Sequence, residues 1–317
     1  MQLSSNYYSP SELVRPNNIQ QTLEELKKSG AKARVVAGNT TLYEFARQGA
    51  LADVEKLIDA KGLGLDFIRK EAQREGNSSE VLSVGCATTF EQLASSTLVK
   101  ASRCWLALSE AAEKITPPQV RNMATIGGAV CSGIPFYDMP VVLVALDARA
   151  EIASLDRGHR MVEMETFFKD YFVTALEPED LLVRFEIPAL AHGGSSFVKL
   201  GRSSSDFAVV NVSVRLARDP SNPDRISDAR VALGAVANTP IRAKRSEETL
   251  KEGTAVDSKL VLQASNAALS ELDPTPSIHA SSSYKKKIIP FLVRDAILLA
   301  LERSAKPATR YDAANPD

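Results

Sequence analysis

The sequence has 317 residues, 44% of them hydrophobic, and its 38 basic and 39 acidic side chains give a formal net charge of −1. This length predicts one large domain or two to three small ones, and the hydrophobic fraction excludes a chain that is disordered throughout. The balanced charge argues against a nucleic-acid-binding surface, which would need an excess of basic residues.

The cysteines and the N-terminus indicate a protein of a reducing compartment. Cys86, Cys104 and Cys131 are odd in number and none belongs to a C-x-x-C pair, which disfavours a disulfide framework and an iron–sulfur cluster held by this chain alone. The first ten residues lack the basic and apolar regions of a secretory signal. The longest apolar run, near 141–146, is too short to span a bilayer. We therefore expect a cytoplasmic protein with no membrane span.

The first half of the chain predicts short strands that alternate with helices. Apolar positions three apart predict a helix over 19–29 that ends at Gly30. The further expected elements are a buried strand over 33–37, a helix over 41–48, a strand over 54–58, a polar surface excursion over 66–79, a strand over 81–86, a helix over 89–96 capped by Thr88 or Thr89, a helix over 106–112, a helix running into a strand over 141–152, and an amphipathic segment over 161–171.

The second half of the chain predicts a different order of elements, with strands first and helices after them. A turn at 177–180 predicts a domain boundary, with one domain over 1–177 (subdomains about 1–58 and 59–177), a second over 178–305, and a loose tail over 306–317. Strands are expected over 182–187, 196–200, 209–216 and 229–236, and helices over 244–251, 257–272 and 284–303. Strands followed by helices predict an α+β unit, with helices on one face of an antiparallel sheet.

Two glycine-containing loops are the strongest functional signal. The first is Val35-Val36-Ala37-Gly38-Asn39-Thr40-Thr41, and the second is Ala124-Thr125-Ile126-Gly127-Gly128-Ala129, with Asp138 ten residues past Gly128. A strand, a tight turn and a helix present free N–H groups and a positive dipole end to an anion. Glycine helps because no Cβ blocks the approach of a phosphate to the backbone. Each loop alone is typical of an ordinary turn, but the two together favour a dinucleotide site.

Other signatures of catalysis are missing from the sequence. No G-x-x-x-x-G-K-[ST] motif occurs, and Gly62-Leu63-Gly64 lacks the third glycine of a dinucleotide fingerprint. His159, His192 and His279 are widely separated and lack metal-ligand spacing. We therefore predict no catalytic side chain and no metal site in this chain.

At these motifs the sequence resembles the FAD-binding medium subunit of the molybdenum hydroxylases, the family that includes xanthine dehydrogenase and aerobic carbon monoxide dehydrogenase. The resemblance extends from about Tyr7 to Arg303. The residues that carry it are Ala37-Gly38-Asn39-Thr40, Thr125-Ile126-Gly127-Gly128, Ile134-Pro135-Phe136-Tyr137-Asp138, Phe185-Glu186-Ile187-Pro188 and Lys199-Leu200-Gly201-Arg202. Their order and spacing make the signal more specific than any one motif.

The resemblance implies an α+β fold, with a two-subdomain FAD-binding region of the PCMH/VAO type followed by a C-terminal antiparallel sheet with helices. It implies non-covalent FAD, with the pyrophosphate on the backbone of the two loops. Asp138 would accept hydrogen bonds from the nucleotide side, and Ile115 and Leu182 would line the flavin. The cofactor-binding residues implied are Val35, Val36, Ala37, Gly38, Asn39, Thr40, Thr41, Ile115, Thr125, Ile126, Gly127, Gly128, Ala129, Asp138, Leu182 and Lys199.

Three positions depart from the family pattern. Ala129 stands where the family usually has Asn, Ile134 replaces Ser, and Thr41 replaces Asp or Glu. Backbone binding of a pyrophosphate does not depend on these side chains, so we expect it to survive. The surroundings of the flavin ring, and with them its redox potential, are expected to differ.

The resemblance also implies partners. A large subunit would bind the molybdenum cofactor and a small subunit would carry two [2Fe–2S] clusters, together forming a dimer of heterotrimers with this chain. FAD here would receive electrons from the clusters and release them to a final acceptor. Two alternatives stay open: a self-contained flavin oxidoreductase of the same fold, and a cofactor-free interaction subunit.

Overall fold

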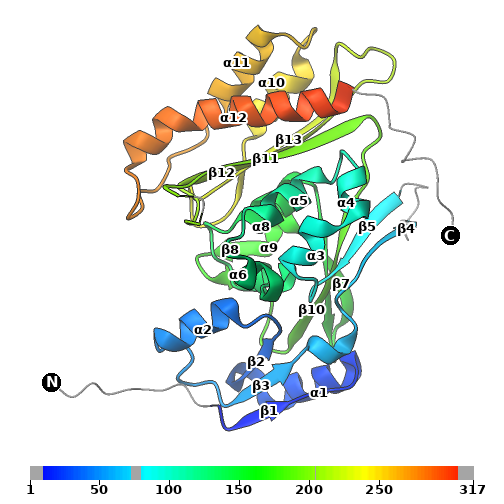
Figure 1. Ribbon diagram of the computed structural model, residues 1–317, viewed down its shortest axis with the longest axis vertical. Coiled ribbons are helices and arrows are strands. Elements are labelled where there is room, and N and C mark those ends of the chain that lie inside the picture. Colours follow the sequence, from blue (N-terminus) through cyan, green and yellow to red (C-terminus); the bar gives the residue numbers. More distant parts are fainter. Residues whose placement is uncertain (1–9, 73–79, 204, 306–317) are drawn as a thin grey trace.

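The computed structural model describes residues 10–72, 80–203 and 205–305, so the predicted loose tail over 306–317 lies outside the described residues. The molecule is elongated, and three parts follow one another along its longest axis in chain order (Figure 1). A small N-terminal part lies at one end, a larger second part lies in the middle, and a C-terminal part with the longest helix lies at the other end.

The N-terminal part is a small parallel sheet with two helices. Its strands are β1 (Glu12–Val14), β2 (Ala33–Val36) and β3 (Lys56–Asp59), in the order β1-β3-β2, and its helices are α1 (Ile19–Ser29) and α2 (Thr40–Arg47). Short 3₁₀ turns cover Gly30–Lys32 and Lys61–Leu63. The Asn18 side chain accepts the N–H of Gln21 at the start of α1, and Gly30 follows its end with φ 52°. The helix predicted over 19–29 is confirmed.

The middle part is built on a five-stranded antiparallel sheet. Its strands run in the order β4 (Ile68–Ala72), β5 (Glu80–Gly85), β10 (Asp180–Pro188), β6 (Arg149–Ser154) and β7 (Gly158–Glu163). Its helices are α3 (Phe90–Ser95), α4 (Thr97–Ala101), α5 (Leu106–Glu113), α6 (Pro118–Met123), α7 (Ile126–Cys131), α8 (Asp138–Ala145) and α9 (Met164–Phe167). A small hairpin pairs β8 (Phe168–Asp170) with β9 (Val173–Thr174). Thr89 caps α3 as predicted, in a capping box with Gln92.

One prediction about the five-stranded sheet is wrong, and another missed a strand. Residues 182–187 were expected to begin the C-terminal sheet, but β10 hydrogen-bonds to β5 on one side and to β6 on the other. A buried apolar run does not reveal which sheet it joins, and we propose that the regions divide after Pro188 instead. The expected surface excursion over 66–79 contains β4, an edge strand of mostly exposed charged residues. Charged side chains on an edge strand prevent it from pairing with another chain. In the sequence, the same charged residues look like those of a loop.

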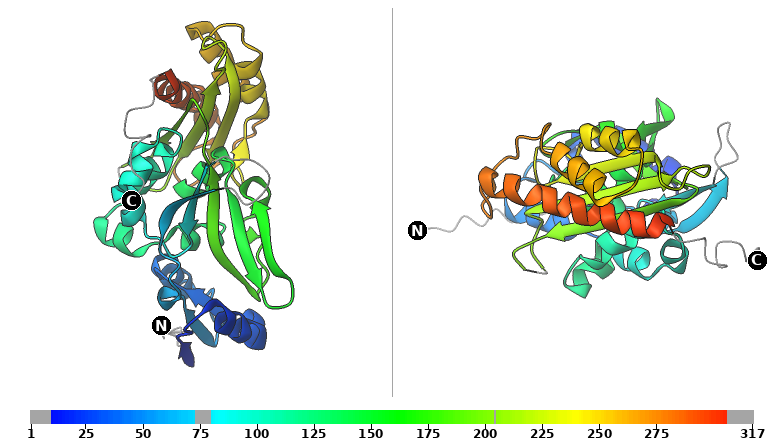
Figure 2. Two further views of the ribbon diagram at one scale, coloured as in Figure 1. Left: turned by 90° about the vertical axis from the view of Figure 1, so that its right-hand side faces the viewer. Right: turned by 90° about the horizontal axis from the view of Figure 1, so that it is seen from above.

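The C-terminal part confirms the expected antiparallel sheet with helices. Its strands are β11 (Gly193–Leu200), β12 (Val210–Arg218), β13 (Ile226–Gly234) and β14 (Ile241–Arg242), and its helices are α10 (Lys244–Glu252), α11 (Ser258–Ala267) and α12 (Ser282–Ala305). These helices cover one face of the sheet (Figure 2). The other face packs on α5 and α8 of the middle part (Figure 1). Residues of β11 and β12 are thereby brought against α8.

Candidate functional site

The first glycine loop presents backbone donors that the protein does not use. Asn39 precedes α2 in the left-handed conformation, with φ 61°, which asparagine tolerates better than most residues. The N–H groups of Gly38 and Asn39 donate to no acceptor within the described ranges. The N–H groups of Thr40 and Thr41 open the helix and therefore have no partner inside it. Several free donors at a helix start fit the diphosphate of a dinucleotide such as FAD.

Gly38 also joins the two loops. A Cβ at this position would overlap the carbonyl oxygen of Met123 and the neighbouring Ala124, so only glycine allows the backbones to approach this closely. Met123 ends α6, two residues before Thr125. The close contact therefore places the first loop beside the start of the second.

In the second loop most of the backbone donors are engaged within the protein. It forms the start of α7, where the N–H of Ile126 donates to Thr88 and that of Gly127 donates to Cys86. The N–H of Gly128 donates to the Thr125 hydroxyl at 3.1 Å. The pyrophosphate was expected on free N–H groups of both loops. Among the described residues most of the unused donors lie on the first loop, and the second contributes the N–H of Thr125.

The two glycines of the second loop have different surroundings. A Cβ at Gly127 would lie 2.6 Å from the carbonyl oxygen of Cys86, so this glycine is required for packing on the end of β5. A Cβ at Gly128 would meet only the Thr125 hydroxyl, at 3.1 Å. Gly128 therefore marks the accessible side of the second loop, where another group can approach the backbone.

Asp138 and Lys199, both expected at the cofactor, form a buried ion pair. Asp138 begins α8 and is 3% exposed, and its Oδ2 lies 2.8 Å from Nζ of Lys199 on β11. Its Oδ1 accepts a hydrogen bond of 2.7 Å from Nδ2 of Asn211 on β12. Burial raises the pKa of the Asp138 carboxyl, while the charge and hydrogen bond of Lys199 and the amide of Asn211 oppose that rise. Both carboxylate oxygens are thus held from the C-terminal sheet.

Thr41 links the N-terminal part to the residue that precedes α8. Its Oγ1 lies 3.0 Å from the hydroxyl of Tyr137, the residue before Asp138. Burial raises the pKa of Tyr137, and the Thr41 hydrogen bond opposes the rise. The Tyr137 ring stacks on Phe207, with 5.8 Å between centroids and 26° between planes. The side chain at position 41 thus binds a tyrosine hydroxyl.

The remaining predicted residues lie in packed surroundings. Leu182 is 4% exposed and sits beside a register shift between β10 and β6. Ile115 follows α5 and is only partly buried against the same core. Ala129 is buried inside α7. Val35 and Val36 are the last residues of β2, and Val36 is buried.

Sequence reasoning missed two side chains that hold this site together, Asn211 and Tyr137. Asn211 belongs to an alternating strand whose apolar residues Val210, Val212 and Val214 pack under the helices. The polar residues of such a strand usually face solvent. Here they face α8 instead, and Arg215 likewise donates to the Leu146 carbonyl oxygen at 3.1 Å.

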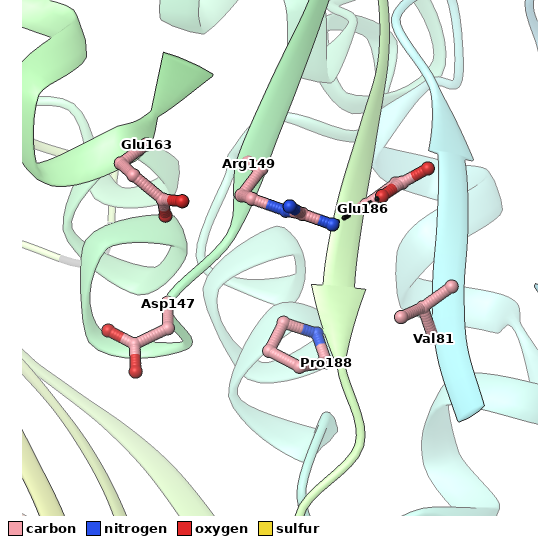
Figure 3. Close-up of a pocket in the computed structure, with 6 residues that line it drawn as sticks. All are labelled: Val81, Asp147, Arg149, Glu163, Glu186 and Pro188. Carbon is pink, nitrogen blue, oxygen red and sulfur yellow. Dashed lines mark hydrogen bonds and ion pairs between the residues drawn. The ribbon is translucent and has the colours of Figure 1, made fainter. Parts of the chain in front are cut away.

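A polar cavity of about 200 Å³ lies elsewhere on the five-stranded sheet (Figure 3). Arg149 points across it to Glu186, with 3.0 Å between Nη2 and Oε2. Burial raises the pKa of Glu163, and the charge of Arg149 opposes the rise. The lining, which contains none of the predicted cofactor-binding residues, is Val81, Asp147, Arg149, Glu163, Glu186 and Pro188.

In residues 10–72, 80–203 and 205–305, no three His, Cys, Asp or Glu side chains are grouped so that they could hold a metal ion. No helix in that part of the chain is long and apolar enough to cross a membrane.

Comparison with known proteins gives matches over nearly the whole chain. Residues 8–190 match the FAD-binding domain found in molybdopterin dehydrogenases, and residues 195–300 match the C-terminal domain of carbon monoxide dehydrogenase flavoproteins. The chain is 30% identical to the alpha subunit of the 6-hydroxypseudooxynicotine dehydrogenase complex of Paenarthrobacter nicotinovorans, covering 92% of this chain and 94% of that one. It is 28% identical to a putative xanthine dehydrogenase FAD-binding subunit of Escherichia coli, covering 84% and 88%.

A solved structure shows the same fold. The carbon monoxide dehydrogenase of Hydrogenophaga pseudoflava, in a form that lacks the Mo-pyranopterin moiety, contains a chain that superimposes with a TM-score of 0.83 at 30% identity. The match covers 93% of this chain and 98% of that one. The resemblance seen in the glycine loops is therefore confirmed, and the chain belongs to the family of FAD-binding medium subunits of the molybdenum hydroxylases.

Proposed function

We propose that this chain binds FAD non-covalently between its two glycine loops and serves as the electron-transfer subunit of a molybdenum-containing hydroxylase or dehydrogenase. The observation that carries the proposal is the set of unused N–H groups at Gly38, Asn39, Thr40 and Thr41. These donors lie on a loop that is packed directly against the segment leading to Thr125. An anionic group is what such a set of donors requires.

When bound, FAD supplies the redox chemistry, accepting electrons from iron–sulfur clusters and releasing them to a final acceptor. The protein supplies binding and orientation. The N–H groups of the first loop bind the diphosphate, and the backbone at Gly128 leaves space beside it. Thr125 accepts the Gly128 N–H and so fixes the second loop. No side chain of this chain is assigned a proton-transfer role.

Other residues shape the site around the cofactor. Lys199 contributes a positive charge whose position is fixed by its 2.8 Å ion pair with Asp138. Ile115 and Leu182 supply apolar surface for the ring system, and Tyr137 holds α2 near α8 through Thr41. The other members of the proposed site are Val35, Val36, Ala37, Ile126, Gly127 and Ala129.

The partners follow from the family. We propose a large subunit with the molybdenum cofactor and a small subunit with two [2Fe–2S] clusters, assembled as a dimer of heterotrimers in the cytoplasm. The carbon monoxide dehydrogenase relatives, whose matched chains are named medium chains, support this assignment. The unpaired thiols of Cys86, Cys104 and Cys131 are consistent with a reducing compartment.

Co-purification tests the assembly. The tagged full chain, expressed with the genes encoded beside its own, is expected to purify under mild conditions with two further subunits. The complex should contain molybdenum, iron and FAD by elemental and chromophore analysis. A chain that purifies alone while its neighbours are expressed and soluble would contradict the proposed assembly.

A further inference from the structure

We infer that Asn211 is a positioning residue for the cofactor site, acting through Asp138 on the placement of Lys199. The inference rests on the proposed function, because it assumes that the Asp138–Lys199 pair lies at bound FAD. It adds a residue from the C-terminal sheet that none of the sequence motifs includes.

Asn211 and Lys199 hold the same carboxylate from neighbouring strands. They are direct cross-strand partners in the antiparallel pairing of β11 with β12. Asn211 donates from Nδ2 to Oδ1 of Asp138 at 2.7 Å, and Lys199 donates from Nζ to Oδ2 at 2.8 Å. Because adjacent side chains on one sheet face lie close together, the pair can hold both oxygens of one carboxylate. Rotation of the Asp138 carboxylate would break one bond or the other.

The carbonyl oxygen of the Asn211 amide lies where it lowers the stability of the fold. Asn211 is fully buried, and its Oδ1 finds no hydrogen-bond partner in the described part of the chain. A Cβ on Gly234 would lie 2.3 Å from this oxygen, so Oδ1 occupies space that the missing side chain of a glycine leaves open. A buried acceptor without a partner destabilises the fold. Packing alone would be served better by leucine. The amide is explained by what its Nδ2 binds at the start of α8, which is Oδ1 of Asp138 at 2.7 Å and, at 3.4 Å, the carbonyl oxygen of Tyr137.

This arrangement gives Asn211 an indirect effect on the cofactor. Without its amide, Asp138 Oδ1 loses the hydrogen bond that fixes the plane of the carboxylate. The Lys199 ammonium is then no longer held in one position, because its carboxylate partner can rotate. Binding of an anionic cofactor near Lys199 should weaken, although Asn211 itself does not touch it.

A double-mutant cycle on the full chain tests the inference. FAD dissociation constants are measured by fluorescence titration for the wild type, Asn211→Leu, Asp138→Ala and the double variant. Asn211→Leu is expected to raise the dissociation constant about tenfold. The double variant should bind no more weakly than Asp138→Ala alone, because the inferred effect of Asn211 on the cofactor runs through Asp138 and not through its longer bond to the Tyr137 carbonyl oxygen.

The matched control is Ser213→Ala, which removes a fully buried hydroxyl two residues along β12. It should leave the FAD dissociation constant unchanged, whereas a general weakening of the strand would raise it too. Asn211→Ser repeats the test if the leucine variant does not fold. Wild-type affinity in the Asn211 variant, or losses that multiply in the double variant, would overturn the inference. If the wild type itself fails to bind FAD, the proposed function is rejected and the inference with it.

Discussion

Nζ of Lys199 lies 2.8 Å from Oδ2 of Asp138, although the two residues are 61 positions apart and belong to different parts of the fold. Asp138 opens a helix of the middle part, and Lys199 lies on the first strand of the C-terminal sheet. The pair therefore ties the C-terminal part to the cofactor-binding region. Its geometry is a consequence of how the sheet packs on α8.

Removing Lys199 should destabilise the protein strongly. Lys199→Met leaves the buried Asp138 carboxylate with Asn211 but no counter-charge, and breaking a buried pair costs about 3–5 kcal/mol. Urea unfolding of the FAD-free chain at pH 7 measures the loss. The control is Arg294→Met, which removes a half-exposed partner of Asp295 and should cost less than about 1 kcal/mol. Equal, small losses in both variants would show that the Lys199 pair contributes little.

Gly38→Ala should disrupt the junction of the two loops. The new Cβ would overlap the Met123 carbonyl oxygen, and overpacking of this kind costs about 1–3 kcal/mol. FAD affinity should fall with it, because the first loop must move away from the second. Gly62→Ala is the control, since its nearest neighbour would be 3.9 Å away. Titration with FAD should show weaker binding by Gly38→Ala than by Gly62→Ala. Unchanged affinity in Gly38→Ala would mean that the junction of the two loops is not part of the FAD site.

Gly127 and Gly128 should respond differently to the same substitution. Gly127→Ala places a Cβ 2.6 Å from the Cys86 carbonyl oxygen and should lower the melting temperature even without FAD. Gly128→Ala meets only the Thr125 hydroxyl at 3.1 Å. It should keep most of the FAD-free stability and lose FAD affinity, because it fills the accessible side of the loop. Thermal melts and FAD titrations of both variants give the comparison. Tight FAD binding by Gly128→Ala would place the cofactor elsewhere.

The acid stability of the protein should depend on Asp180. Burial favours its neutral form, but hydrogen bonds from Arg160, the Glu177 N–H and Arg157 outweigh that effect and hold the pKa of Asp180 below its ordinary value. A lowered pKa stabilises the fold above the ordinary carboxyl pKa, and the contribution is lost as pH falls through the native value.

Asp180→Asn should therefore cost about 3 kcal/mol at pH 7, and its difference from the wild type should shrink as pH falls below about 4. Urea unfolding between pH 7 and pH 3 measures the free energy of unfolding of both proteins as a function of pH. Asp66→Asn, at an exposed position, should follow the wild type throughout. A pH-independent difference for Asp180→Asn would mean that the ionised carboxylate is not what stabilises this turn.

Local patterns in the sequence were sufficient for most helices and for several of the longer strands, but not for strands such as β1, β4 and β7. The helix over 19–29 has its own cap signals, and Thr89 caps α3 with a local partner. The assignment of β10 failed because the apolar run over 182–187 fits any buried strand. Which strands pair is decided by packing between distant segments, and one strand's composition does not contain that information.

The sequence predicted which residues belong to the candidate site better than it predicted which of them touch one another. The motifs named both glycine loops, Asp138 and Lys199 as candidates, and the structure joins Asp138 to Lys199 in an ion pair. The role of Gly127 could not be found, because it depends on where Cys86 lies in space. Asn211 was missed for a related reason, since a polar residue on an alternating strand is typical of a solvent face.

The visible absorbance spectrum of the purified full chain, followed by denaturation and identification of any released chromophore, tests the central claim most directly. The account predicts a flavin spectrum and free FAD in the supernatant after denaturation, because binding rests on backbone donors and not on a covalent bond. A colourless chain that also fails to bind added FAD would contradict the cofactor site, and the loops at Gly38 and Gly128 would then be ordinary turns.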